Sequence, residues 1–209
     1  MKHTSYFDGQ IQTFDNVFSE NILEKMVTEC WRLDYRYGAS DSNSEGEKIP
    51  TGLTTMGIDY SETFWYRKLW RFCEDNIPEL DDWTLARHHV NLFAPNENAR
   101  YHTDQDRYKG RTVLFYANLY WDINELGETK FLVSDSQKFK GDIKTSGDGS
   151  YPIVLSIAPI PGRVIIFNGA IQHSATALRQ EHRFTPTFQF IDHGLIGHPK
   201  IKYAGEHND

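Results

Sequence analysis

Three residues whose side chains could bind one metal ion are widely separated in the chain. His102 and Asp104 stand two positions apart, and His173 follows 71 positions after His102. In an extended segment, side chains two positions apart point to the same side, so the first pair can approach one ion together. His173 would complete the group if the intervening strands curl into a barrel. The sequence therefore predicts a metal site of two imidazoles and one carboxylate.

This ligand set indicates a particular kind of metal chemistry. Two histidines and one carboxylate that leave open coordination positions are typical of non-haem Fe(II) oxygenases. A structural zinc site would instead need a fourth protein ligand. A His-x-Asp pair is common by chance and the chain has nine histidines, so the inference depends on all three residues together. A lone histidine is more often a surface or hydrogen-bonded core residue.

Arg183 follows His173 by ten positions and lies in a segment of alternating polar and apolar residues. By this alternation, Arg183 and Thr185 share one polar face of a strand. A forked guanidinium beside a hydroxyl group can bind a carboxylate. The alternative is a surface arginine paired with Glu181. Combined with the metal ligands, the arrangement favours an acid bound near the metal.

The periodicity of apolar residues predicts the elements that hold these side chains. Helical spacing predicts one helix that begins after Ser19 and ends near Gly38, and a second over residues 61–76. Alternation and short apolar runs predict strands over residues 85–94, 112–120, 153–157, 164–167, 174–177 and 184–191. Many short strands separated by glycine, proline and aspartate indicate a mainly β fold, a sandwich or barrel with flanking helices.

Length and composition limit the class of protein. A chain of 209 residues suits a single domain, and 39% hydrophobic with 14% aromatic residues suits a folded core. The net charge of -7 disfavours nucleic-acid binding, which needs clustered basic residues. The first residues lack the apolar stretch of an export signal, and no run of about 18 apolar residues predicts a membrane span. We therefore expect a cytoplasmic protein without nucleic-acid or membrane partners.

Two cysteines and two irregular polar segments lie outside the predicted metal site. Cys30 and Cys73 fall at apolar positions of the two predicted helices, which favours buried free thiols over a disulfide. Residues 41–48 are polar and predict an exposed loop. The irregular segment 138–151 predicts a flexible surface loop, with a lid over the site as the alternative.

Further motifs occur in a fixed order through residues 84–192. They are His102-Thr103-Asp104, Tyr116-Ala117-Asn118-Leu119-Tyr120-Trp121, Leu126-Gly127-Glu128-Thr129-Lys130-Phe131, Pro161-Gly162-Arg163-Val164-Ile165-Ile166-Phe167, and His173 with Arg183. In this order the motifs resemble those of the Fe(II)- and 2-oxoglutarate-dependent dioxygenases, in the prolyl-4-hydroxylase-like branch. Each motif is weak alone, and the ordered set is specific.

The resemblance implies a double-stranded β-helix, the jelly-roll or cupin-like fold. Residues 84–192 would form this core. Residues 1–83 would be mostly helical support and loops, and residues 193–209 a C-terminal tail. The three parts would make one dioxygenase domain over residues 1–209.

The resemblance also implies the cofactors and their ligands. His102, Asp104 and His173 would bind Fe(II), with 2-oxoglutarate as co-substrate and O2 as oxidant. Arg183 would bind the distal carboxylate of 2-oxoglutarate. Tyr116 falls where this branch often has a tyrosine in contact with that carboxylate.

Three neighbouring features receive secondary roles by the same resemblance. Thr185 would assist the arginine, and Asn118 lies on the co-substrate face by alternation. The turn element Gly127-Glu128-Thr129 is expected to be mainly structural, because glycine permits the backbone geometry of such a turn.

Departures from the family pattern bear on the substrate. Arg183 replaces the lysine of many prolyl hydroxylases, and no extra peptide-binding domain or basic groove is evident, so a prolyl peptide is not assumed. Related halogenases carry a small residue where Asp104 stands, so the carboxylate favours hydroxylation or another oxidation such as desaturation.

Three polar residues are candidate substrate contacts because they lie on polar strand faces: His89, Asn91 and Tyr120. The alternative is that they are ordinary residues of a strand surface.

The predicted function is hydroxylation of an unactivated C–H bond of a small-molecule metabolite, derived from an amino acid or a sugar, with release of succinate and CO2. One alternative is a protein hydroxylase that acts on prolyl or other residues. Another is a jelly-roll binding protein without catalysis. The presence of both the metal ligands and the arginine favours an enzyme.

Overall fold

The structure is a computed structural model, and it describes residues 1–42, 48–55, 61–105, 109–133 and 153–192. At residues 38–42, 48–51 and 153–154 it describes the backbone alone. Segment 138–151, predicted to be a loop or lid, and the predicted tail 193–209 lie outside the described residues.

The described residues form eleven strands in two sheets. The larger sheet has the order β1-β2-β9-β6-β11-β5-β4-β3, and the smaller has the order β10-β7-β8. All their pairings are antiparallel. The strands are β1 (Lys2–Tyr6), β2 (Ile11–Asp15), β3 (Arg36–Ser42), β4 (Lys48–Thr54), β5 (Trp83–Phe93), β6 (Gly110–Phe115), β7 (Thr129–Val133), β8 (Ile153–Ile157), β9 (Val164–Asn168), β10 (His173–Ala175) and β11 (Arg183–Asp192).

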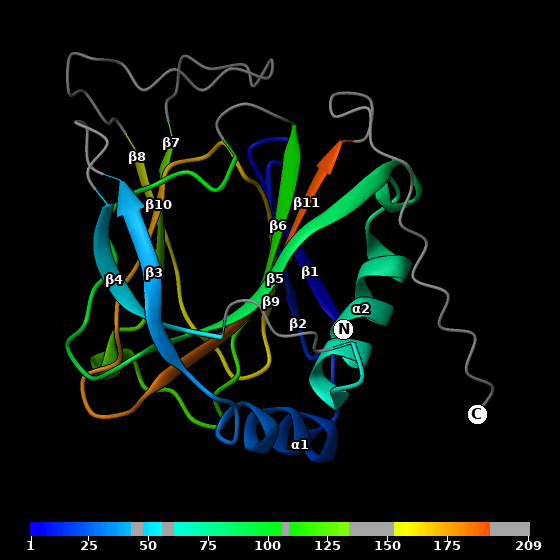
Figure 1. The fold of residues 1–209 in the computed structure, drawn as a ribbon. Coiled ribbons are helices and arrows are strands. Elements are labelled where there is room, and N and C mark those ends of the chain that lie inside the picture. Colours follow the sequence, from blue (N-terminus) through cyan, green and yellow to red (C-terminus); the bar gives the residue numbers. More distant parts are fainter. Residues whose placement is uncertain (43–47, 56–60, 106–108, 134–152, 193–209) are drawn as a thin grey trace.

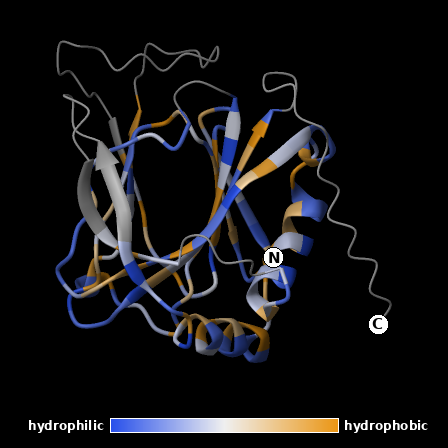
Figure 2. Ribbon diagram, viewed as in Figure 1, coloured by the Kyte–Doolittle hydropathy of each residue, from blue (hydrophilic) through white to orange (hydrophobic). Residues whose placement is uncertain are grey.

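The two sheets and two helices make three layers. Helices α1 (Glu20–Cys30) and α2 (Phe64–Asn76) lie on the side of the large sheet that faces away from the small sheet (Figure 1). Each helix carries both hydrophobic and hydrophilic residues (Figure 2), as expected for a helix that buries one side. The architecture is the predicted mainly β fold with flanking helices, and it has a jelly-roll core.

Strand β11 separates the hydrophobic core from the interior between the sheets. Its alternating residues Phe184, Phe188 and Phe190 belong to the core cluster that includes both helices. Arg183 and Thr187 alternate with these phenylalanines, so they point to the opposite face, toward the small sheet. Both faces are buried, which is why this strand lacks an exposed polar face.

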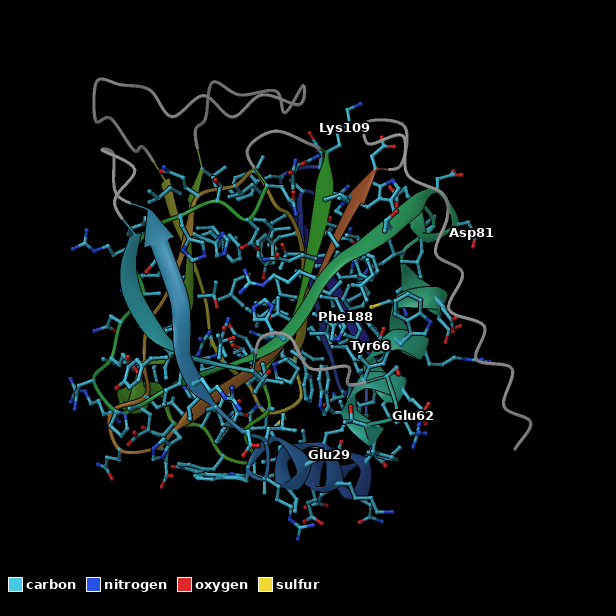
Figure 3. All side chains as sticks on the ribbon, viewed as in Figure 1. Glu29, Glu62, Tyr66, Asp81, Lys109 and Phe188 are labelled. Atoms are coloured by element: carbon cyan, nitrogen blue, oxygen red, sulfur yellow. The ribbon has the colours of Figure 1, made fainter. Side chains whose placement is uncertain are left out.

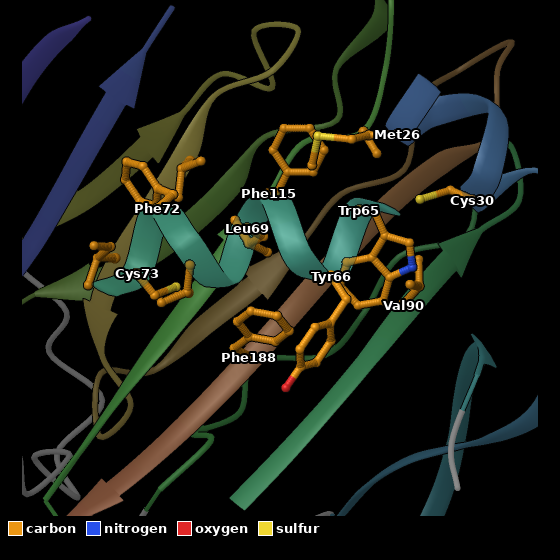
Figure 4. Packing of buried hydrophobic residues seen from close by; sticks show 14 of the residues in the cluster. Met26, Cys30, Trp65, Tyr66, Leu69, Phe72, Cys73, Val90, Phe115 and Phe188 are labelled. Carbon is orange, nitrogen blue, oxygen red and sulfur yellow. The ribbon is translucent and has the colours of Figure 1, made fainter. Parts of the chain in front are cut away.

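Aromatic packing holds α2 against the large sheet. Trp65 and Leu69 are fully buried, and Tyr66 contacts Phe188 edge-on with ring centroids 4.9 Å apart (Figures 3 and 4). Phe115 on β6 joins the same cluster. The aromatic residues of α2 that are buried therefore belong to the core. This packing keeps β5, β6 and β11 in place behind the site.

Helix α2 begins against a carboxylate of the other helix. Glu29 accepts hydrogen bonds from the backbone N–H groups of Phe64 and Trp65, at 3.0 and 2.7 Å. These N–H groups lack partners within the helix, and a negative charge at a helix N-terminus is favourable. Ser19 stands at the N-cap of α1 as predicted, although its side chain makes no capping hydrogen bond.

The prediction that residues 1–83 are mostly helices and loops was wrong in part. They hold the two helices, but also strands β1 to β4. The first predicted helix ends at Cys30 and not near Gly38. β3 ends at Ser42 and β4 begins at Lys48, so both ends of the predicted polar loop 41–48 belong to strands, and residues 43–47 lie outside the described residues. These strands contain glycine, proline and polar residues, and their pairing with the large sheet depends on distant segments.

Other predictions for the elements are confirmed or shortened. Strands β5, β8, β9, β10 and β11 match the predicted segments to within about two residues, whereas β6 ends at Phe115 and not at residue 120. Cys30 and Cys73 are buried free thiols, as predicted, and burial raises the pKa of each. Neither described α-helix has the length and apolar character required to span a bilayer.

Candidate metal and co-substrate site

The three predicted metal ligands meet between the two sheets. One donor atom from each of His102, Asp104 and His173 lies within 4.8 Å of the others. Nε2 of His102 is 3.7 Å from Oδ1 of Asp104, and Nε2 of His173 is 3.6 Å from Oδ2. The backbones of the two histidines pair directly through two N–H···O hydrogen bonds of 3.0 and 2.9 Å. This pairing brings together ligands that are 71 positions apart in the sequence.

Both imidazoles are held in the tautomer that binds a metal through Nε2. Nδ1 of His102 lies 2.9 Å from the carbonyl oxygen of Arg100, and Nδ1 of His173 lies 2.9 Å from that of Ile171. A carbonyl oxygen only accepts, so each Nδ1 carries the proton in these hydrogen bonds. With the proton placed on Nδ1, Nε2 of each ring is the atom that can bind a metal ion, as in histidine ligands oriented by a backbone carbonyl.

Asp104 is positioned by a hydroxyl group and by the backbone. Thr112 on β6 donates a 2.6 Å hydrogen bond to Oδ2, and the Asp104 N–H donates to the carbonyl of Gly169 at 2.9 Å. Burial opposes ionisation of the carboxylate, but His173, His102 and the Thr112 hydroxyl outweigh it and lower its pKa. The ligand is therefore an oriented carboxylate.

Arg183 and Tyr116 meet at the hydroxyl group of Thr129. Nη2 of Arg183 donates to Oγ1 of Thr129 at 2.9 Å, and the Tyr116 hydroxyl lies 2.7 Å from the same oxygen. The guanidinium carbon also lies 5.2 Å from the centroid of the Tyr116 ring and 5.6 Å from that of Phe93. Two aromatic rings and one hydroxyl group thus fix the direction of the arginine.

The guanidinium of Arg183 is buried and forms no ion pair with a described carboxylate, although the charge of Glu128 also acts on it. The residue is 1% exposed, and its Nε and Nη1 atoms have no hydrogen-bond partner. No ion pair joins it to a carboxylate among the described residues, and burial lowers its pKa. A buried charge is costly unless paired, so this site fits an anion that supplies two acceptor oxygens.

An apolar stretch separates the arginine from the metal ligands. Phe131 follows Thr129 by two residues on β7 and pairs with His173 on β10. Phe131 and Leu114 belong to a buried apolar cluster that also includes Tyr116. Two residues of strand advance about 6.6 Å, comparable with the length of a five-carbon diacid. A cation at one end, a metal site at the other and apolar walls between fit 2-oxoglutarate.

The predicted co-substrate residues differ in their contacts. Tyr116 and Thr185 are both buried within the site region, Tyr116 beside Arg183 and Thr185 two residues after it on β11. Asn118 follows β6, and its amide nitrogen donates to the carbonyls of Tyr120 and Pro159 at 2.9 and 3.0 Å. These contacts favour a structural role for Asn118, and its contact with the co-substrate stays a prediction.

The predicted substrate residues fall into two groups. His89 and Asn91 on β5 pair with Thr187 and Thr185 of β11, so they face the interior that contains Arg183. Tyr120 is 69% exposed, in the loop after β6. The structure thus brings His89 and Asn91 to the site region. A role for the exposed Tyr120 stays a prediction.

Two residues of the site were not singled out from the sequence. Thr112 was predicted as a strand residue, and its bond to Asp104 depends on a segment that bends back after β5. Thr129 was assigned a mainly structural role in the turn 127–129, but it begins β7 and bonds Arg183. The structural role of Gly127 is supported by its positive φ of 85°. One signal in the sequence could have identified Thr129. Thr129 and Phe131 stand two positions apart, so they share one face of a short strand.

Comparisons with known proteins by sequence find no matching family model and no matching curated protein. Solved structures do match. A prolyl-4-hydroxylase from Pseudomonas putida is 14% identical with a TM-score of 0.60, covering 88% of this chain and 92% of that one. A prolyl hydroxylase from Trichoplax adhaerens is 13% identical with a TM-score of 0.63, covering 88% of this chain and 84% of that one. That structure is a complex with a peptide fragment of the hypoxia inducible factor oxygen degradation domain.

A third similar structure has a different bound molecule. HygX from Streptomyces hygroscopicus, with nickel, 2-oxoglutarate and hygromycin B bound, is 13% identical with a TM-score of 0.60, covering 88% of this chain and 83% of HygX. These likenesses show that the chain has the jelly-roll fold found in 2-oxoglutarate- and Fe(II)-dependent oxygenases.

Proposed function

We propose that the protein is an Fe(II)- and 2-oxoglutarate-dependent oxygenase that hydroxylates an unactivated C–H bond of a small molecule. The observation that carries this proposal is the unpaired, buried guanidinium of Arg183, in the same interior as the two histidines and the carboxylate. A metal site alone would support many functions. A metal site with a buried receptor for an acid favours this co-substrate.

The ligand atoms fit iron and leave part of its coordination sphere to other molecules. Nε2 of His102, Nε2 of His173 and one oxygen of Asp104 would hold Fe(II), which accepts this set of two imidazoles and one carboxylate. The Nδ1 hydrogen bonds to backbone carbonyls and the Thr112 hydrogen bond would keep the ligand atoms in place. Three protein ligands leave positions for the co-substrate and O2.

The protein residues would orient the co-substrate and exclude water. Arg183 would bind the distal carboxylate through its unpaired Nε and Nη1, while Thr129 and Tyr116 fix its position. Leu114 and Phe131 would cover the methylene groups and keep water from the reacting end. Iron and 2-oxoglutarate supply the oxidising chemistry when bound: substrate C–H, O2 and 2-oxoglutarate give C–OH, succinate and CO2.

The proposed substrate is a metabolite derived from an amino acid or a sugar. One similar structure binds hygromycin B and another a peptide, so the fold alone does not favour either class. The polar residues His89 and Asn91 on the interior face of β5 support a small hydrophilic molecule. Hydroxylation of a protein is the second candidate, and it is favoured by the likeness to the two prolyl hydroxylases.

Succinate formation tests the proposal. The purified protein with Fe(II), 2-oxoglutarate and air should form succinate slowly without substrate and faster with a substrate from a panel of metabolites and peptides. Asp104→Ala should abolish both rates because it removes a metal ligand. Absence of both iron binding and turnover would instead support a binding protein without catalysis.

A further inference from the structure

We propose that four side chains on one interior face of the large sheet, Thr54, His89, Asn91 and Gln189, bind the hydroxyl groups of an uncharged, hydroxyl-rich substrate such as a sugar or cyclitol. We call this set the polar wall. The inference rests on the proposed function and adds to it the chemical class of the substrate.

The strand register places the polar wall on the same face as the metal site. Gln189 on β11 stands directly between Thr112 on β6 and Arg87 on β5. Directly paired residues point to the same face of a sheet, and Thr112 bonds Asp104. Gln189 therefore faces the interior that contains the metal ligands.

The other members continue this face along β5 and into β4. His89 and Asn91 alternate with apolar Val90, which packs in the core beneath the helices. Asn91 pairs with Thr54 on β4, so Thr54 extends the same row. His89 pairs with Thr187 of β11, which lies on the same interior face as Arg183.

Three members of the polar wall are buried, and the fourth, Asn91, is half-buried. Thr54, His89 and Gln189 are 1%, 3% and 7% exposed. Oγ1 of Thr54 and Nδ1 of His89 have no hydrogen-bond partner, and no side-chain hydrogen bond of Gln189 or Asn91 is found among the described residues. An unsatisfied buried polar group is destabilising, so a cluster of them fits a site whose partners arrive with a ligand.

The chemistry of the polar wall fits hydroxyl groups. Amides of Asn91 and Gln189 each offer donors and an acceptor, and the Thr54 hydroxyl offers both. Burial lowers the pKa of His89 to about 3, so its ring is neutral and also has one donor and one acceptor. The four side chains carry no charge, and the cation that continues the same face of β5 is Arg87, which pairs with Gln189. Hydroxyl groups, which donate and accept at one atom, complement such a surface better than a charged or apolar group.

Binding without turnover tests the inference. The protein would be loaded with Mn(II) and 2-oxoglutarate, and calorimetry would measure binding of neutral monosaccharides and cyclitols, sugar acids, sugar phosphates and a proline-containing peptide. At least one neutral hydroxyl-rich compound should bind. Gln189→Met and His89→Leu should each weaken its Kd about tenfold or more, while the affinities for Mn(II) and 2-oxoglutarate stay within about twofold. Gln12→Met is the matched control, because Gln12 lies on β2 and its amide bonds Gly9. This variant should leave the affinities for the hydroxyl-rich compound, Mn(II) and 2-oxoglutarate unchanged.

Thermal unfolding of the ligand-free protein gives an independent readout. Gln189→Met removes an unpartnered amide, so it should keep or raise the Tm. Asn118→Leu removes an amide with two backbone partners, so it should lower the Tm. This opposite behaviour separates an amide held for a ligand from a structural one.

The outcomes distinguish the inference from the proposed function. Failure to bind Mn(II) and 2-oxoglutarate would contradict both. Normal loading, followed by binding of only the peptide or the charged compounds, or of nothing in the panel, would overturn the inference and leave the oxygenase proposal in place. A lowered Tm for Gln189→Met with unchanged ligand affinity would also overturn it.

Discussion

The Thr112 hydroxyl donates a 2.6 Å hydrogen bond to Oδ2 of Asp104, the carboxylate of the candidate metal site. The two residues lie eight positions apart, on β6 and on the segment that precedes it. The bond uses one lone pair of the carboxylate and restricts its rotation. A short strand of the jelly roll thereby sets the orientation of a metal ligand.

Thr112→Val should weaken metal binding without unfolding the protein. Valine keeps the volume of threonine but removes the donor, and loss of a partner that orients a ligand typically weakens metal affinity about 10- to 100-fold. Calorimetry with Mn(II) measures this change. Thr13→Val, at a buried threonine of β2, is the control and should bind Mn(II) as the wild type does. Equal Mn(II) affinity in the two variants would show that Thr112 does not position Asp104.

Tyr116 and Thr129, the residue that also bonds Arg183, should be energetically coupled. Thr129→Val leaves the guanidinium and the phenol without their shared oxygen, and an unsatisfied buried donor costs about 1–3 kcal/mol. Urea unfolding of Thr129→Val, Tyr116→Phe and the double variant forms a cycle. We expect a coupling of about 0.5 kcal/mol or more. Strict additivity would mean that the Tyr116 hydroxyl and Thr129 do not interact in the folded protein.

Glu29 should stabilise the junction of the two helices. Glu29→Gln keeps one acceptor but removes the charge at the α2 N-terminus, and Glu29→Ala removes both N–H contacts. The alanine variant should lose about 1–2 kcal/mol in the free energy of unfolding, as for other N-terminal caps, and the glutamine variant less. Glu24→Ala, at an exposed position of α1, should change little. A loss in Glu29→Ala no larger than in Glu24→Ala would contradict the capping role.

His89 should make the metal-free protein less stable in acid. Burial lowers its pKa from 6.5 to about 3, with the Arg87 charge adding to this effect, Asp104 opposing it and His88 adding slightly. Below pH 6.5 the unfolded chain binds a proton that the folded protein does not bind until about pH 3. The free energy of unfolding therefore falls through this window, by at most about 1.4 kcal/mol per pH unit from this group.

The variant His89→Leu tests that pH dependence. Its free energy of unfolding should fall less steeply between pH 6.5 and 4 than that of the wild type, as measured by urea titrations at each pH. His3→Leu, at an exposed histidine, should keep the wild-type slope. Parallel curves for the wild type and His89→Leu would mean that the imidazole is protonated in the folded protein.

The metal ligands were predictable because their signal is local or chemically distinctive. His102 and Asp104 can be recognised by their spacing of two positions, and Arg183 by the alternation of polar and apolar residues along one strand. The residues that position these side chains were harder to predict from the sequence. Thr112 and Thr129 are ordinary strand threonines in the sequence, and only the pairing of distant strands shows what their hydroxyl groups contact.

Pairing with other strands also explains the strands that were missed. β1 and β4 have few apolar residues in alternation, and they form because a neighbouring strand supplies the hydrogen bonds. β7 is short and lies beside a turn, so its sequence resembled part of the turn. In contrast, four of the five residues in each of β8 and β9 are apolar, and the positions of these strands follow directly from hydrophobicity.

The most direct test of a joint site for iron and 2-oxoglutarate is an anaerobic absorption titration. Adding 2-oxoglutarate to the Fe(II)-loaded protein should produce the visible charge-transfer band of the chelate. Arg183→Met should bind iron normally but need about 100-fold more 2-oxoglutarate, because it removes the partner of a buried carboxylate. Arg163→Met, which breaks a partly buried ion pair with Asp15, should retain the wild-type affinity for 2-oxoglutarate. No band in the wild type, or an unchanged 2-oxoglutarate affinity in Arg183→Met, would contradict the account.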